Sequence, residues 1–193
     1  MWAETVKQRL LELQRTDPAF EQIDAPTGYR VNAPIRFEDL DAAELLLNCE
    51  LPAAYRVFLM DIGNGGAGPG YGLQPFDLND VDIDEAKRPF PFSASYRETG
   101  SREEQNDYWD RRDHGSLPLC DYGCGQFARL VLNGPFAGEV WIAYWSVDMG
   151  MQRFGNYVTE HNPELSCGDF AVYFDEWYAT WLDGFEARLA EKD

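Results

Sequence analysis

The stretch Leu51-Pro52-Ala53-Ala54-Tyr55-Arg56-Val57-Phe58-Leu59-Met60-Asp61-Ile62-Gly63-Asn64-Gly65-Gly66 decides the fold of this chain. Proline suits the first turn of a helix, where its missing N–H would have no partner, so Pro52 predicts a helix start. Apolar residues then recur at helical spacing on one face: Tyr55, Phe58, Leu59 and Ile62. Gly63 is expected to end this helix with a positive φ, and the glycines that follow predict a tight turn before the chain re-enters the core at Leu73.

Further helices are predicted on both sides of this unit. Helical spacing of apolar residues favours an amphipathic helix over 2–13 and a second helix over 37–47 that stops at Asn48. The loop between them has room for a short edge strand over 29–32. A last helix is expected to start near Asp169, whose carboxylate would cap it, and to pack on the sheet with one aromatic face: Phe170, Tyr173 or Phe174, Trp177, Trp181 and Phe185.

The region 117–147 predicts the sheet. Two runs of β-forming residues, 127–132 and 139–145, are separated by a loop that contains Gly134 and Gly138, which is typical of paired antiparallel strands. Along the second run, both sets of alternating side chains are bulky, so both faces of the sheet are expected to be covered. The predicted fold class is therefore α+β: a single domain over 1–193 with a mainly antiparallel sheet and N- and C-terminal helices packed on it.

Composition restricts the function classes. The 193 residues carry 16 Lys and Arg against 34 Asp and Glu, a net charge of −18, which disfavours direct nucleic-acid and membrane binding and favours a cationic partner. Such an acidic balance is also common for solubility alone. There is no apolar run of about 18 residues and no secretory pattern at the start, so a soluble, cytoplasmic protein with reduced cysteines is expected.

Two acidic segments form the candidate partner-binding surface. In 77–85 acidic and aliphatic residues alternate with period two, which predicts an extended row of outward carboxylates. The polar run 101–112 predicts an exposed helix with a capping box formed by Ser101 and Glu104. The candidate residues are Asp77, Asp80, Asp82, Asp84, Glu85, Glu103, Glu104, Asp107, Tyr108, Trp109 and Asp110. Tyr108 and Trp109 are either aromatic anchors for the partner or core residues.

No catalytic, cofactor or metal site is predicted. The glycines of 63–68 match G-x-G-x-x-G, but a helix precedes them and Pro69 follows, whereas a dinucleotide site needs a strand before and a helix after. Cys120 and Cys124 form a single short pair, and structural zinc sites need two. The acidic residues stand in polar runs that would not separate their pKa values, so the protein is expected not to be an enzyme.

Four motifs together resemble the SUKH superfamily, in particular its Smi/Knr branch. The first is the opening stretch, with Leu51-Pro52, Tyr55-Arg56, Phe58-Leu59 and Asn64-Gly65-Gly66. The others follow in the same order: Leu117-Pro118-Leu119 with Tyr122-Gly123-Cys124-Gly125, Leu130 to Gly134 with Gly138 to Trp141, and Phe170, Trp177 and Trp181-Leu182. The resemblance covers about 33–182 and leaves a helix and loop over 1–32.

The resemblance implies an α+β domain that serves as a bacterial immunity protein and neutralises a polymorphic toxin. With the acidic charge, it implies a basic toxin domain of nuclease or deaminase type, bound without catalysis. The alternative is a regulatory or scaffolding module with no toxin partner. A toxin gene beside this one would favour the former reading, and a metabolic operon the latter. The motif residues expected to hold the fold are Pro52, Asn64, Gly65, Gly66, Gly134, Gly138, Trp141, Trp177 and Trp181.

Overall fold

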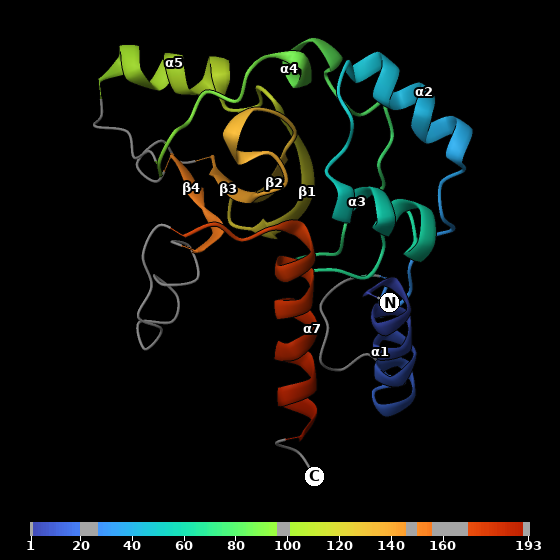
Figure 1. Cartoon of the computed structure of the whole chain (residues 1–193). Helices are drawn as coiled ribbons and strands as arrows, with labels where there is room; N and C mark the ends of the chain where they lie inside the picture. Colours follow the sequence, from blue (N-terminus) through green and yellow to red (C-terminus); the bar gives the residue numbers. More distant parts are fainter. Residues whose placement is uncertain (1, 20–26, 96–100, 146–149, 156–169, 191–193) are drawn as a thin grey trace.

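The protein has an α+β fold, as predicted. The computed structural model describes residues 2–19, 27–95, 101–145, 150–155 and 170–190. Within them lie the helices α1 (Trp2–Thr16), α2 (Phe37–Leu47), α3 (Ala53–Val57), α4 (Ile83–Lys87), α5 (Arg102–Arg111) and α7 (Phe174–Ala190). The antiparallel sheet has the strand order β1 (Ser116–Gly123), β2 (Gln126–Val131), β3 (Val140–Tyr144) and β4 (Met151–Arg153) (Figure 1).

Both faces of the sheet are covered, which confirms the prediction from its bulky alternation. Every residue of β3 is buried. Ile142 and Tyr144 face the main core, whereas Trp141 and Ala143 face a second, smaller apolar cluster. Tyr108 of α5 and Phe92, in the segment between α4 and α5, complete that second cluster. The sheet is therefore a middle layer, with α5 on one side and the main core on the other.

The central helix forms where the opening stretch predicts it, with one irregularity. Pro52 is the residue before α3, and the helix continues as a π-helical turn over Phe58–Ile62. Gly63 follows with a φ of 171°, which is extended backbone, so the expected positive φ is wrong. Glycine is required there because an added Cβ would lie 2.5 Å from the carbonyl oxygen of Asn32.

The glycine turn after this helix is held on both sides by backbone hydrogen bonds. Gly65 and Gly66 have φ values of 80° and 105°, as the turn prediction requires. Gly66 exchanges two hydrogen bonds of 2.8 Å with Leu73, and the Gly65 carbonyl accepts one from the Asn32 amide. The Asn64 side chain bonds the Phe76 amide and carbonyl at 2.7 and 3.2 Å. Asn64, Gly65 and Gly66 therefore join three segments of chain.

The tryptophans of the motifs pack in or against the apolar clusters of the protein. Trp141 is fully buried, and its indole N–H donates to buried Glu139, which also forms an ion pair of 2.8 Å with Arg153. Trp177 is buried and donates to the Tyr122 hydroxyl, and half-buried Trp181 lies 5.2 Å from Tyr178 between ring centroids. Gly134 and Gly138, with φ of 75° and 91°, bracket the short turn between β2 and β3.

The last helix differs from its prediction. It begins at Phe174, and Phe170 and Tyr173 are exposed rather than on the core face. Glu176 accepts a hydrogen bond from the Tyr173 amide, so the start lies where this carboxylate can cap it. The expected cap, Asp169, lies outside the described residues. The helix packs on α1 and α3 rather than mainly on the sheet, with Phe174 5.5 Å from Phe58 between ring centroids (Figure 1).

The N-terminal half follows its predictions closely. α1 buries Val6, Leu10 and Leu13, and α2 ends at Asn48, whose φ of 54° is left-handed. The short edge strand is reduced to a single bridge between Val31 and Gly66.

Within the described residues no helix has both the length and the apolar character that crossing a membrane requires.

Candidate functional site

The first acidic segment is a turn and a helix rather than an extended row, so the period-two prediction of its backbone is wrong. The Asp82 side chain accepts hydrogen bonds from the amides of Asp84 and Glu85, both at 3.1 Å, and caps α4. A carboxylate at this position satisfies amides that the helix leaves free, which outweighs the weak strand preference of the alternation. Leu78, Val81 and Ile83 still pack inward, and Asp77, Asp80, Asp82 and Asp84 remain exposed.

The second acidic segment is α5, the exposed helix that the sequence predicts. Ser101 and Glu104 form the expected capping box. α5 and α4 lie on the side of the molecule away from α1 and α7 (Figure 1). The link between them is direct, since His114, just after α5, lies 2.6 Å from the Glu85 carboxylate of α4. The two segments therefore form one surface, which we call the acidic face: the candidate carboxylates of 77–85 and 103–110.

The carboxylates of the acidic face are not equivalent. Glu85 is engaged by Arg88 and His114, and Asp107 forms an ion pair of 2.7 Å with Arg111. Asp77, Asp82 and Glu104 bond turns and helix ends. The remaining four are exposed, and their carboxylates make no hydrogen bond or ion pair with any described residue: Asp80, Asp84, Glu103 and Asp110. These four are the carboxylates of the acidic face that no described residue engages.

A cleft lies between the first acidic segment and the strands β1 and β2. It measures about 160 Å³ and is lined by Asp80, Asp82, Glu85, Asp113 and Arg129, among others. The Arg129 guanidinium lies 2.8 Å from Asp113 and donates to the Ser116 hydroxyl. Burial lowers the pKa of Arg129, while Asp113 opposes that shift. Arg129 thus ties Asp113, just after α5, to the sheet.

Tyr108 cannot be a partner contact, because it is fully buried. Its hydroxyl lies 2.9 Å from the Tyr144 carbonyl oxygen and 2.8 Å from that of Gly150. Burial raises the pKa of Tyr108 to about 12. Of the two alternatives for this residue, the core position is the correct one.

Trp109 lies at the surface and has a neighbour that sequence reasoning missed. Trp109 is 37% exposed and Trp145, just after β3, is 59% exposed, with their ring centroids 6.3 Å apart. The Arg112 guanidinium lies 4.4 Å from the Trp109 centroid and 5.5 Å from that of Trp145. We call these three residues the tryptophan patch. The sequence pattern places Trp145 in the predicted strand 139–145. Its position as the last residue of that strand is the one feature of the sequence that indicates an exposed side chain.

The cysteines outside the acidic face differ in their exposure. Cys120 is buried, and burial raises the pKa of its thiol, whereas Cys124 is exposed at the β1–β2 hairpin. Within the described ranges no three His, Cys, Asp or Glu side chains are placed to hold a metal ion. His161 and Cys167 lie outside these ranges.

Comparison with known proteins gives one result. A model of the SMI1 / KNR4 family (SUKH-1) matches residues 34–178. This range includes the central helix, the glycine turn, the acidic face and the whole sheet. No curated protein matches the chain.

Proposed function

Because the chain belongs to the SMI1 / KNR4 family (SUKH-1), which contains immunity proteins, we propose that it is an immunity protein. It binds a toxin domain with a positively charged surface, of nuclease or deaminase type, and neutralises it without catalysis. Members of this family are generally non-catalytic.

The observation that carries the proposal is the acidic face. Asp80, Asp84, Glu103 and Asp110 are exposed and unengaged within the described chain, in a protein of net charge −18. Opposite fields accelerate the encounter of two proteins, and a cationic partner would meet these carboxylates first. A nuclease or deaminase needs positive charge to hold phosphate groups, so a bound acidic protein would compete with the substrate for that surface.

The tryptophan patch supplies the second part of the proposed interface. Charges at the rim of an interface act mainly on the association rate, whereas aromatic and arginine side chains at its centre provide most of the binding energy. Trp109, Arg112 and Trp145 are of these residue types, and Trp109 directly precedes Asp110 in α5. We therefore assign partner attraction to the carboxylates and partner retention to the tryptophan patch.

The test begins with the partner, captured by co-purification from the source cells and identified. Association kinetics are then measured at low and high salt for the wild type and for Asp80→Lys/Asp84→Lys, which leaves the capping residue Asp82 intact. We expect association about tenfold slower at low salt, an unchanged melting temperature, and little difference at high salt, because salt screens exposed charges.

Two control variants make the test specific. The variant Glu12→Lys/Glu38→Lys carries its substitutions on α1 and α2 and changes the net charge by the same amount as the variant of the acidic face. Its association should be slowed much less. Trp145→Ala should accelerate dissociation with little effect on association. If both charge variants associate equally slowly, the acidic face acts only through the net charge of the protein and is not the binding surface. A partner with neither positive charge nor toxin activity would overturn the proposal in favour of a scaffolding role.

A further inference from the structure

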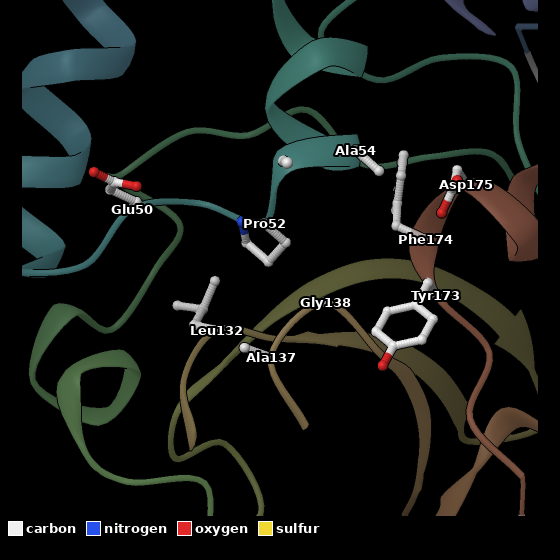
Figure 2. Close-up of a pocket in the computed structure, with 10 residues that line it drawn as sticks. Glu50, Pro52, Ala54, Leu132, Ala137, Gly138, Tyr173, Phe174 and Asp175 are labelled. Carbon is white, nitrogen blue, oxygen red and sulfur yellow. The ribbon is translucent and has the colours of Figure 1, made fainter. Parts of the chain in front are cut away.

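A separate groove lies between the starts of α3 and α7 and the connection from β2 to β3 (Figure 2). Its volume is about 260 Å³. Pro52 and Ala54 form one wall, and Leu132 and Gly138 lie opposite. Pockets for whole small-molecule ligands measure about 300 Å³ or more, so this groove suits a single side chain better than a cofactor.

The walls of the groove are fixed by backbone hydrogen bonds between its elements. The Gly138 amide donates to the Val131 carbonyl at 2.9 Å, and the Phe174 amide donates to the Gly138 carbonyl at 3.1 Å. Gly138 has a φ of 91°, and a Cβ there would lie 3.3 Å from the Tyr173 ring and 3.6 Å from Pro52. Glycine therefore keeps the groove open, and a ligand would not have to order it.

The charges of the groove are of one sign. Figure 2 shows Glu50 at one end and Asp175 at the other, with the Tyr173 ring between them on the lower side. Neither carboxylate has a hydrogen-bond or ion-pair partner among the described residues, and the described lining contains no Lys, Arg or His. Tyr173 is 46% exposed, so its ring is open to a ligand. Apolar walls, a free aromatic ring and two unpaired carboxylates are complementary to a long cationic side chain.

We propose that this groove binds an arginine side chain presented by a protein partner. The methylene stem would lie on Pro52, Ala54 and Leu132, because long basic side chains bury their stems on apolar surface. The planar guanidinium would lie against Tyr173 and pair with a carboxylate at the end of the groove. Arginine fits better than lysine, since it stacks on aromatic rings and is less strongly hydrated. This inference concerns a second surface and does not rest on the acidic face.

The experiment uses the full chain and a small probe, Nα-acetyl-arginine N-methylamide, in a titration followed by amide NMR shifts. The matched control is the citrulline analogue, which has the same shape without the charge. We expect saturable shifts at Ala54, Gly138 and Asp175 with a millimolar Kd, and binding up to about fivefold weaker for citrulline, the size of one exposed ion pair. The lysine analogue should bind more weakly than the arginine one.

Two variants separate the possible outcomes. In Glu50→Gln/Asp175→Asn the arginine probe should bind about as weakly as citrulline, with the spectrum otherwise unchanged. In Asp80→Lys/Asp84→Lys the shifts at Gly138 should persist. The proposal for the groove can therefore be confirmed even if the proposal for the acidic face is wrong. Equal binding of arginine and citrulline would overturn the proposal, as would shifts confined to residues 80–84.

Discussion

The glycine turn, residues 63–76, and the acidic segment, residues 77–85, are adjacent in the chain and are built in opposite ways. In the turn, backbone amides and carbonyls are bonded to segments on both sides, and added Cβ atoms would meet backbone. In the acidic segment the four aspartates are exposed, and only a turn and one helix end depend on their carboxylates. The comparison shows that residues fixed by backbone packing and residues with exposed carboxylates can lie within a few positions of each other.

The largest expected effect is a substitution within the turn. A Cβ at Gly66 would lie 2.5 Å from the Arg30 carbonyl oxygen, and one at Gly65 would lie 2.7 Å from the Pro75 nitrogen. Backbone atoms cannot move aside cheaply, so Gly65→Ala and Gly66→Ala should each lower the free energy of unfolding by about 3 kcal/mol or more, through overpacking and left-handed strain together. Urea denaturation measures this.

Gly134 provides a matched control for that prediction. Its φ of 75° is close to that of Gly65, but no atom lies within 4 Å of the added Cβ. Gly134→Ala should therefore lower the free energy of unfolding by only about 1–2 kcal/mol, from conformational strain alone. If the variants at 66 and 134 unfold at the same urea concentration, the close approach in the turn is not what makes glycine necessary.

An asparagine on each side of the boundary gives an intermediate effect. Asn64→Ala leaves the amide and carbonyl of Phe76 without their side-chain partner, and unfolding should become easier by about 2 kcal/mol. The Asn79 side chain, in the acidic segment, donates to the exposed Asp77 carboxylate at 2.7 Å and to no other described residue. Asn79→Ala should therefore change the free energy of unfolding by less than about 0.5 kcal/mol. Thermal and urea unfolding of the two variants would contradict the comparison if their order were reversed.

The smallest expected effect lies within the acidic segment itself. Asp82 caps α4, so Asp82→Ala should lower the free energy of unfolding by about 1 kcal/mol. Asp80→Ala removes a carboxylate with no described partner and should stay within about 0.5 kcal/mol of the wild type. A loss of stability in Asp80→Ala equal to that in Asp82→Ala would show that the exposed charges support the fold as well.

Local chemistry was sufficient to predict much of the fold. α1, α2 and α5 follow from helical spacing and capping residues, and the β2–β3 pair follows from its glycine-interrupted strands. The prediction failed where two local preferences compete. In 77–85 the alternation of residue types favours a strand, but the Asp82 cap and contacts with α2 favour a short helix. The start of α7 was misplaced because either Asp169 or Glu176 could cap it.

The site was less accessible to prediction, because its properties depend on contacts between distant segments. Eleven residues were assigned to a partner surface, yet whether Asp107 or Glu85 is neutralised depends on Arg111, Arg88 and His114. Tyr108 and Trp109 are adjacent in sequence and both are aromatic. The packing of α5 on the sheet alone decides that Tyr108 is buried and Trp109 is exposed. The groove has no sequence signal, since its walls come from three separate parts of the chain.

The tryptophan patch also provides an intrinsic optical reporter. Trp141 and Trp177 are enclosed and shielded from solutes, whereas Trp109 and Trp145 are open to collisional quenchers. Neutral acrylamide should therefore quench the emission of the patch, while iodide, which the protein's net charge of −18 repels, should quench it less efficiently until salt screens the repulsion. A bound partner that covers the patch would suppress quenching by both. The native chain could thus report occupancy of its proposed interface without a label.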